Sequence, residues 1–242
     1  MNIVEEKKIE KNIISLKNVV KKFDGNIIIS DVSFNVREGT IHAFVGPNGA
    51  GKSTIINLIT NILVEDGGEI KIDGLTKNDF FYGENISLVN VETPCLGKNV
   101  EETVSTLNIL IGLEDRELSE KFYENKISNF KEINLNDLST GWKKIFNIFI
   151  LELTKRKIMI LDEPFNGLDP IVRREMLEYL LRKKKEGCSI LLSSHILSDL
   201  QEISDDITMI KKGKIIYTGK LNIDIEKEYF YHFKEKEEKK IF

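Results

Sequence analysis

The sequence of 242 residues predicts an α/β fold, in which a core of strands and helices carries an antiparallel β subdomain and an inserted helical subdomain. Residues 41–45 form a short apolar run, and after a glycine-rich loop apolar side chains recur at helical spacing, which predicts a strand, a loop and a helix. Residues 13–20 and 27–36 alternate apolar and polar side chains, as antiparallel strands do. From about residue 99 to 150 the pattern becomes that of charged, amphipathic helix. This length suits one large domain or a core with a subdomain.

The composition is ordinary for a globular protein and shows no bias toward nucleic acid. Hydrophobic residues make up 41%, charged residues 31%, and the net charge is -4. Cys95 and Cys188 are far apart and form no CxxC pair, which argues against a disulfide framework or a zinc site. No apolar stretch is long enough to cross a bilayer, and the first residues lack a signal-peptide core. We therefore expect any work at a membrane to depend on a partner.

The first half of the chain contains further strand signals around the central loop. Asp24-Gly25-Asn26 predicts the turn between the first two strands, and Phe23 lies at this turn. Glycines bound a short strand at residues 67–74, and residues 86–91 predict a buried strand. The helix after the loop is expected to carry its apolar face on Ile55, Ile56, Leu58, Ile59 and Ile62.

The second half returns to the α/β pattern after the helical stretch, where Val104, Leu107 and Ile111 share one face. An apolar strand at residues 157–161 ends in Asp162-Glu163-Pro164. Three elements are expected to follow: a helix at 171–185, a strand at 189–192, and a hairpin at 207–217 with its turn at Lys212-Gly213. Residues 226–242 are dense in Lys and Glu, and we expect a solvated segment, helical or disordered.

The loop after residue 45 matches the phosphate-binding pattern GxxxxGK[ST] without a gap. Glycines permit turns that other residues avoid and let backbone N–H groups approach phosphate, while the helix that begins near Lys52 adds its positive end. Lys52 is predicted to reach the β- and γ-phosphates of a nucleotide, and the Ser53 hydroxyl to ligate Mg²⁺. A glycine turn without a ligand is disfavoured because spacing, flanking elements and the Lys-Ser pair agree. The loop consists of Gly46, Pro47, Asn48, Gly49, Ala50, Gly51, Lys52, Ser53 and Thr54.

Two carboxylates follow the later apolar strand. Asp162 ends that strand downstream of a phosphate-binding loop, which is the place of the acid that holds Mg²⁺, usually through water. Glu163 would then lie beside the γ-phosphate, where it can orient or deprotonate an attacking water. Alone, Asp-Glu-Pro is equally typical of a turn at the end of a strand. The preceding phosphate-binding loop favours the functional interpretation.

Four motifs follow that loop in a characteristic order: Leu138-Ser139-Thr140-Gly141-Trp142, Ile160-Leu161-Asp162-Glu163-Pro164, Gly167-Leu168-Asp169-Pro170 and Ser193-Ser194-His195. Over about residues 13–219 the chain resembles the nucleotide-binding subunit of an ATP-binding cassette (ABC) transporter. The resemblance implies a P-loop NTPase fold of the ABC type, with a RecA-like core at residues 1–90 and 155–220. It also implies a helical signature subdomain at 91–154 and a charged C-terminal tail at 221–242.

The resemblance implies roles for individual residues. Phe23 is at the place of the aromatic that stacks on adenine, although a plain core or turn aromatic is the alternative. Ser139 and Gly141 match the signature loop that contacts the γ-phosphate of ATP held by the opposing subunit, and Ser139 also suits a helix N-cap. Asp169 matches the loop that crosses the dimer interface, or simply caps the helix that follows. His195 matches the switch histidine that contacts the γ-phosphate.

The sequence departs from the common family pattern in three places. Thr140 stands where the signature usually has Gly, and Trp142 stands where it has Gln. A side chain at the first place can crowd the phosphate, whereas Gly141 keeps a close approach possible. The usual loop glutamine is replaced in its region by Val91-Glu92-Thr93-Pro94, which resembles bacterial exporters that include bacitracin and lantibiotic self-protection transporters. Glu92 is therefore the candidate that senses Mg²⁺ or water and passes the state to a membrane subunit, with a surface carboxylate as the alternative.

The resemblance as a whole implies an ATPase that converts ATP and water to ADP and phosphate. Two cassettes, identical or different, would pair head to tail around two ATP molecules and drive a separate integral membrane subunit, with export favoured, from the cytoplasmic face of the membrane. Lys52, Mg²⁺ and His195 would stabilise charge on the γ-phosphoryl group while Glu163 handles water.

Two alternatives to this transport ATPase stay open. A degenerate regulatory subunit would bind ATP with little hydrolysis. The departures from the signature at Thr140 and Trp142 are the reason to consider it. A soluble ABC ATPase of DNA repair or ribosomes would usually carry coiled coils, zinc motifs or two cassettes, and the sequence has none of these. No nucleic-acid partner is expected.

Overall fold

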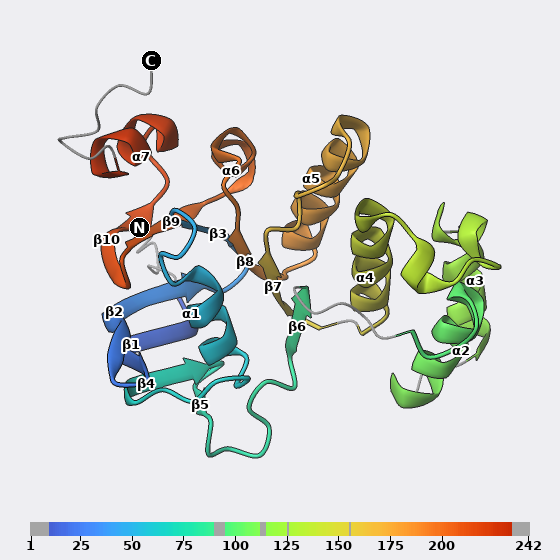
Figure 1. Ribbon diagram of the computed structural model, residues 1–242, viewed down its shortest axis with the longest axis horizontal. Helices are drawn as coiled ribbons and strands as arrows, with labels where there is room; N and C mark the ends of the chain where they lie inside the picture. Colours follow the sequence, from blue (N-terminus) through green and yellow to red (C-terminus); the bar gives the residue numbers. More distant parts are fainter. Residues whose placement is uncertain (1–9, 90–94, 112–114, 125, 155, 234–242) are drawn as a thin grey trace, which may run out of the picture.

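The computed structural model describes residues 10–89, 95–111, 115–124, 126–154 and 156–233. In these ranges the strands form two sheets, and the helices between residues 100 and 154 lie at the opposite end of the molecule from the antiparallel sheet (Figure 1). None of the described helices is long and apolar enough to span a bilayer.

The antiparallel sheet has the strand order β2-β1-β4-β5. Along β1, the side chains of Ile14, Leu16 and Val19 are buried, and Leu16 lies opposite Phe34 of β2. One face of this sheet therefore packs on the core, as the alternating sequence pattern predicts. The strands are β1 (Asn12–Phe23), β2 (Asn26–Arg37), β4 (Gly67–Ile72) and the two-residue β5 (Leu75–Thr76).

The larger sheet has the order β10-β9-β3-β8-β7-β6, and all its strands except β10 run parallel. Every residue of β3 is buried, which explains its uninterrupted apolar character, since both faces of a parallel sheet are covered. The carboxyl ends of β3, β7 and β8 meet at one edge, where open α/β sheets bind ligands. The strands are β3 (Ile41–Val45), β6 (Ile86–Val89), β7 (Ile158–Asp162), β8 (Ser189–Ser193), β9 (Asp206–Lys211) and β10 (Lys214–Lys220).

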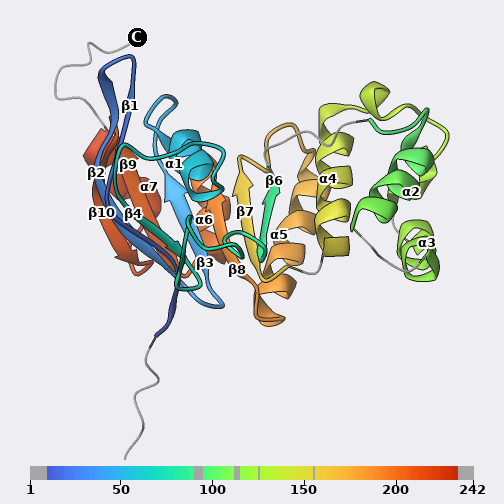
Figure 2. The same cartoon turned by 90° about the horizontal axis from the view of Figure 1, so that it is seen from below.

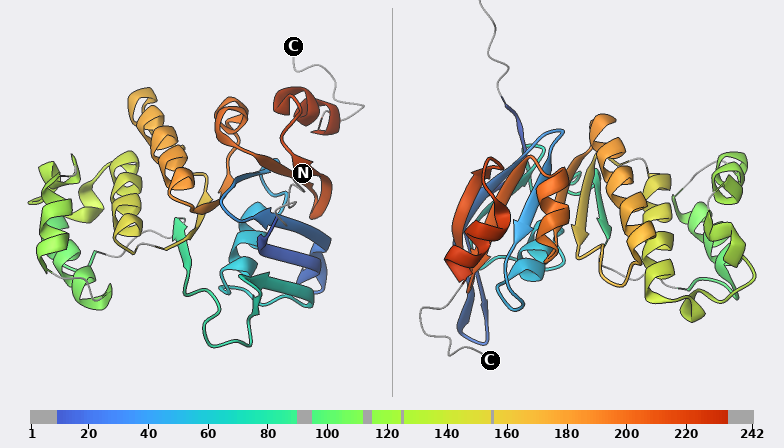
Figure 3. Two further views of the ribbon diagram at one scale, coloured as in Figure 1. Left: turned by 180° about the vertical axis from the view of Figure 1, so that it is seen from behind. Right: turned by 90° about the horizontal axis from the view of Figure 1, so that it is seen from above.

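Two hydrophobic clusters cover the two faces of the larger sheet. On one face α1 (Lys52–Ile59) and the antiparallel sheet pack against Phe44 and Ile160. On the other face α5 (Pro170–Lys185), α6 (Leu197–Ile203) and α7 (Ile225–Phe233) pack against alternate residues of the same strands. The sheet is therefore the middle layer of the core, as the views from below and above show (Figures 2 and 3).

The remaining helices have a hydrophobic cluster of their own. Val104 on α2 (Val100–Ile111), Phe122 on α3 (Asp115–Glu124) and Phe146 on α4 (Thr140–Thr154) are buried together. Leu107 packs against this cluster, and the side chain of Ile111 lies outside the described residues. Short 3-10 helices at Lys126–Phe130 and Leu135–Asp137 connect α3 to α4.

The structure corrects two expectations. Helix α1 ends at Ile59, and Ile62 is 55% exposed, because Asn61 adopts a left-handed conformation (φ +60°) that stops the helix. The segment from residue 226 is helical as far as Phe233, one of the two forms expected, but it is not simply solvated, because Tyr229 and Phe233 pack against the cluster behind the sheet. The aromatic residues of this segment supply an apolar face that its high charge conceals in a composition count. Residues 234–242 lie outside the described part.

Candidate functional site

A cavity of ≈ 320 Å³ lies where the carboxyl ends of β3 and β7 meet the start of α1. It brings residues of the glycine-rich loop together with both acidic residues after β7, although Ser53 and Asp162 are separated by 109 positions. Ile28 of β2 also lines the cavity, and no sequence motif marks it. The lining is Ile28, Asn48, Gly49, Gly51, Lys52, Ser53, Thr54, Asp162 and Glu163.

The loop has a conformation that requires glycine. Gly49 and Gly51 have φ of +76° and +108°, and a Cβ at Gly51 would lie 2.6 Å from the Ile29 Cδ1. Gly46 is buried, and a Cβ there would collide with the backbone oxygen of Ile210. Beneath the loop, Ala50 is buried against the core. The chain can therefore turn sharply into α1, whose first N–H groups lack intrahelical acceptors and suit an anion.

Lys52 is held close to the loop from which it projects. Its side chain is 8% exposed, and Nζ donates to the Gly46 oxygen at 2.6 Å and to the Pro47 oxygen at 3.4 Å. The ammonium also lies 3.9 Å from Glu163 Oε1. A positively charged donor thus lies between the loop and a carboxylate, within reach of phosphate oxygens bound at the loop.

Asp162 is anchored by two hydroxyl groups. Ser53 Oγ donates to its Oδ2 at 2.7 Å, and Ser193 Oγ of β8 donates to its Oδ1. Hydroxyl and carboxylate oxygens are the ligands that Mg²⁺ prefers, and Mg²⁺ usually takes only one or two protein carboxylates. The described residues contain no group of three or more His, Cys, Asp or Glu that could enclose a metal. The pair fits an ion that draws its other ligands from phosphate and water.

Glu163 is fixed at both its backbone and its carboxylate. Its N–H donates to Ser193 through both the carbonyl oxygen (3.1 Å) and Oγ (3.0 Å), and its φ is +50°, a strained value for this residue type. Its Oε2 lies 2.8 Å from His195 Nδ1 and 3.3 Å from the His195 backbone nitrogen. This carboxylate can accept a proton from water and share it with His195.

Lys144 of α4 contacts Glu163, although no sequence motif marks it. Its Nζ donates to the backbone oxygen of Glu163 at 2.6 Å. Burial lowers the pKa of Lys144, and the negative charges of Glu163 and Asp162 oppose that shift. Ser193 likewise belongs to the site through its hydrogen bonds, although the sequence suggested only that it precedes His195.

Some predicted residues do not line this cavity in the described structure. Phe23 lies at the β1–β2 turn with 41% of its surface exposed, and Lys21 Nζ lies 5.4 Å from its ring centre. Ser139 lies at the start of α4, where its Oγ accepts from the Trp142 N–H at 3.4 Å. Asp169 caps α5 by accepting from the backbone N–H groups of residues 171 and 172. Glu92 lies outside the described residues.

The two unusual signature residues have contacts within this chain. The Trp142 ring lies 4.3 Å from that of Phe130, so it packs within the helical cluster. A Cβ at Gly167 would lie 3.7 Å from Thr140 Cγ2, and one at Gly141 would lie 3.0 Å from the Gly167 oxygen. The start of α4 is therefore in close contact with the loop that follows Glu163.

Comparisons with known proteins agree with this geometry. The family model described as ABC transporter matches residues 29–166. Lantibiotic transport ATP-binding protein SrtF of Streptococcus pyogenes is 32% identical over 220 residues, covering 89% of this chain and 91% of that protein. The uncharacterized ABC transporter ATP-binding protein YhcH of Bacillus subtilis is 32% identical over 253 residues, covering 94% and 77%.

Solved structures show the same fold. The structure titled "Structure of ATP binding subunit of ABC transporter" matches with a TM-score of 0.80 and 27% identity, covering 90% of this chain and 98% of that one. A nucleotide-free ATP-binding cassette from an ABC transporter matches with a TM-score of 0.76 and 25% identity, covering 93% and 97%. With the glycine-rich loop, the paired acids and the matching family model, the chain belongs to the ABC transporter family as an ATP-binding subunit that hydrolyses ATP.

Proposed function

We propose that this chain hydrolyses Mg-ATP in the cavity at the glycine-rich loop, and that two such cassettes together drive export through a separate membrane subunit. One observation carries the catalytic part of the proposal. The Glu163 carboxylate lies between His195 Nδ1 at 2.8 Å and Lys52 Nζ at 3.9 Å, at the edge of the phosphate-binding loop. A base, a cation and an anion site thus converge where the terminal phosphate of a nucleotide would lie.

ATP would place its phosphates against the loop and the start of α1. Lys52 would exchange its contact with the Gly46 oxygen for oxygens of the β- and γ-phosphates. Ser53 and Asp162, which lie together in the structure, would hold Mg²⁺ with their hydroxyl and carboxylate oxygens. When bound, this ion neutralises charge on the phosphate oxygens.

Glu163 would accept a proton from water as the water oxygen attacks the γ-phosphorus. The bond from that phosphorus to the oxygen shared with the β-phosphate breaks, and ADP leaves with the bonding electron pair. His195 holds the Glu163 carboxylate in place, and together with Lys52 it would stabilise charge on the γ-phosphoryl group. Preorganisation of these groups supplies the catalysis, because phosphoryl transfer needs little covalent help from the protein.

The exposed start of α4 would contact a second cassette. Ser139 and Gly141 do not line the described cavity of their own chain, so their proposed partner is the γ-phosphate of an ATP held by the opposing chain. Residues 91–154 would act as the signature subdomain that carries them. Asp169 would lie at the interface between the two chains, and Phe23 would stack on adenine.

The membrane part of the proposal rests on the family and on residues 91–94. Glu92 would report the state of the site to the membrane subunit, which would hold the chain at the inner, cytoplasmic face of the membrane. The direction is proposed as export, because these residues resemble a branch of exporters and one relative is named for lantibiotic transport.

Glu163→Gln tests the catalytic assignment, because it keeps the shape of the side chain and removes the base. We expect kcat for Mg-ATP hydrolysis to fall by about 10²–10⁴-fold, with binding of a fluorescent ATP analogue preserved. Glu178→Gln, an exposed carboxylate on α5, is the matched control and should retain the wild-type rate. Full hydrolysis by Glu163→Gln would remove Glu163 from the role of base.

A further inference from the structure

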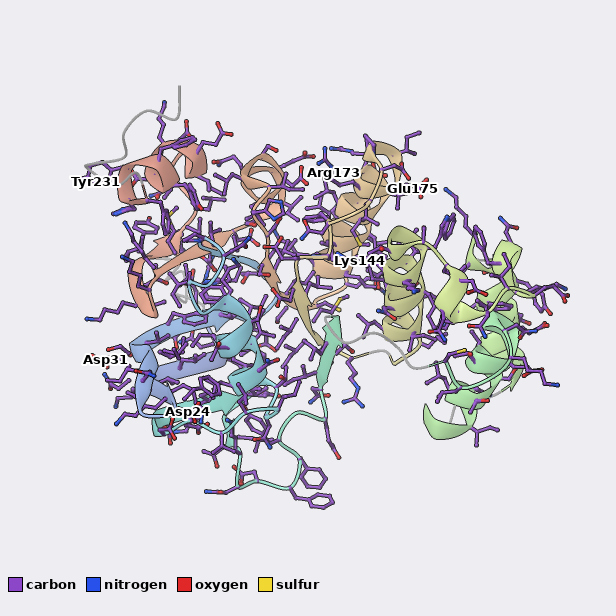
Figure 4. All side chains as sticks on the ribbon, in the orientation of Figure 1. Asp24, Asp31, Lys144, Arg173, Glu175 and Tyr231 are labelled. Carbon is purple, nitrogen blue, oxygen red and sulfur yellow. The ribbon has the colours of Figure 1, made fainter. Side chains whose placement is uncertain are left out.

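A lysine from another part of the fold holds the backbone of Glu163. Lys144 is in the second turn of α4, and its Nζ donates to the Glu163 oxygen at 2.6 Å. In Figure 4 Lys144 lies on the side of α4 that faces β7 and α5. Its side chain is half-buried, and its positive charge lies near the carboxylates of both Glu163 and Asp162.

The same peptide is held on its other side by the sheet. Ser193 of β8 accepts the Glu163 N–H with two oxygens, while Lys144 and the Asn166 N–H donate to the Glu163 oxygen. Glu163 has φ +50°, and a strained residue keeps such a value only where its surroundings hold it. The conformation of Glu163 therefore depends on contacts from both the core and α4.

The start of α4 also touches the loop that follows Glu163. Thr140 and Gly141 lie against Gly167, and Trp142 fixes the same helical turn on Phe130. A shift of α4 would therefore reach Glu163 through Lys144 and the following loop through Gly167. The two contacts lie within two helical turns of the place where the opposing cassette is proposed to bind.

We propose that Lys144 is a positioning residue, which links the signature helix α4 to the catalytic carboxylate of Glu163 in the same chain. When α4 binds the nucleotide of a second cassette, the hydrogen bond from Lys144 would shift the Glu163 peptide and so set the direction of the Glu163 carboxylate. The inference rests on the proposed function, because it takes Glu163 as the base and α4 as the contact to the second chain.

Lys144→Met is the central variant, because methionine keeps a long apolar side chain and removes the donor. We expect kcat for Mg-ATP hydrolysis to fall by about 10- to 100-fold, since small misplacements of a catalytic group have such effects. KM for ATP should stay within about twofold, since Lys144 does not line the described nucleotide cavity. Lys144→Arg can still donate to the carbonyl and should restore kcat to within about threefold of wild type.

Lys143→Met is the matched control, because it removes the same charge from the adjacent position of α4. It should change kcat by less than about twofold if the hydrogen bond to Glu163, rather than the charge of the helix, matters. Thermal unfolding of each variant checks that the chain is folded. Should Lys144→Met fail to fold, Lys144→Gln takes its place: its neutral side chain is too short to donate to the Glu163 oxygen as Lys144 does, so it should also lose kcat without a change in KM.

The outcomes separate the two proposals. An inactive wild-type chain, also with its membrane partner present, would overturn the proposed hydrolysis itself. An active wild type with an equally active Lys144→Met would overturn the role of Lys144 alone. Equal losses in Lys143→Met and Lys144→Met, or no recovery in Lys144→Arg, would also overturn it. A fall in kcat that Arg reverses, with KM unchanged, supports it.

Discussion

Arg37 and Asp206 form an ion pair that joins the antiparallel sheet to β9. Arg37 Nε lies 2.8 Å from Asp206 Oδ2, and the Asp206 side chain is only 6% exposed. Arg37→Met leaves this carboxylate buried without its partner, so we expect the free energy of unfolding to fall by about 3 kcal/mol in urea titrations. Lys220→Met breaks a pair with Glu10 in which both side chains are more than half exposed, and should lower the free energy of unfolding far less than Arg37→Met does, because water screens an exposed pair. Equal losses in the two variants would contradict this ranking.

His42 makes stability depend on pH. It is fully buried on β3 with Nε2 2.8 Å from Thr208 Oγ1, and burial lowers its pKa to about 4, an effect that Asp206 opposes and Arg37 assists. Below pH 6.5 the unfolded chain binds a proton on His42, whereas His42 of the folded chain stays neutral down to about pH 4. This contribution to the free energy of unfolding is therefore complete above pH 6.5 and is lost as the pH falls. The difference corresponds to roughly 3 kcal/mol.

His42→Gln removes this titration and keeps a polar group that can reach Thr208. We expect the free energy of unfolding of the variant to change less between pH 7 and 4.5 than that of the wild type. Urea titrations at several pH values measure it. Parallel curves for the two proteins would show that another group causes the pH dependence.

At the scale of elements, the β9–β10 turn packs between β2 and the glycine-rich loop. Gly213 has φ +73°, its N–H donates to the Ala50 oxygen at 2.9 Å, and its own oxygen accepts from Ser30 at 2.9 Å. A Cβ there would collide with the backbone oxygen of Ile28. This turn therefore joins both sheets to the loop that would hold phosphate.

Gly213→Ala should destabilise the fold by about 2–4 kcal/mol, because it combines an unfavourable φ with a backbone collision. Gly25→Ala is the matched control: Gly25 has φ +80°, and a Cβ there would meet no atom within 4 Å. It should cost about 1 kcal/mol, the backbone strain alone. Chemical denaturation measures the free energy of unfolding of both variants. If Gly213→Ala lowers it no more than Gly25→Ala does, the backbone at Ile28 can move to accept the added methyl group.

At the scale of the whole molecule, the proposed site is complete only in a pair of chains. The unmodified chain has a mass of 27.8 kDa. We expect the mass of the Glu163→Gln protein in light scattering to double when Mg-ATP is added. Adding Ser139→Glu to Glu163→Gln should abolish the dimer, because a carboxylate would face the γ-phosphate of the other chain. ATP binding should persist, since Ser139 does not line the described cavity of its own chain. A dimer that survives Ser139→Glu would refute the assignment of α4 to the interface.

Most local elements could be predicted from the sequence, because periodicity and turn residues act over a few positions. The buried strand at residues 41–45 was predicted with the bounds that β3 has, and the strand before Asp162 within one residue. The short elements α6 and β5 were not predicted, since seven and two residues carry too little periodicity. The packed face of α7 was missed because its charge outweighs its aromatic residues in composition.

For the candidate site, the chemical groups could be predicted from the motifs: a loop that must turn through glycines, a lysine, two acids and a histidine in an order typical of ABC ATPases. That Ile28, Ser193 and Lys144 lie with these groups, and that Trp142 packs on Phe130, is visible only in the folded chain. The difference lies in how far apart in the sequence the contacting residues are. A motif records residues that neighbouring backbone conformation places together, whereas these contacts exist because separate strands and helices pack side by side, which leaves no periodic trace in the chain.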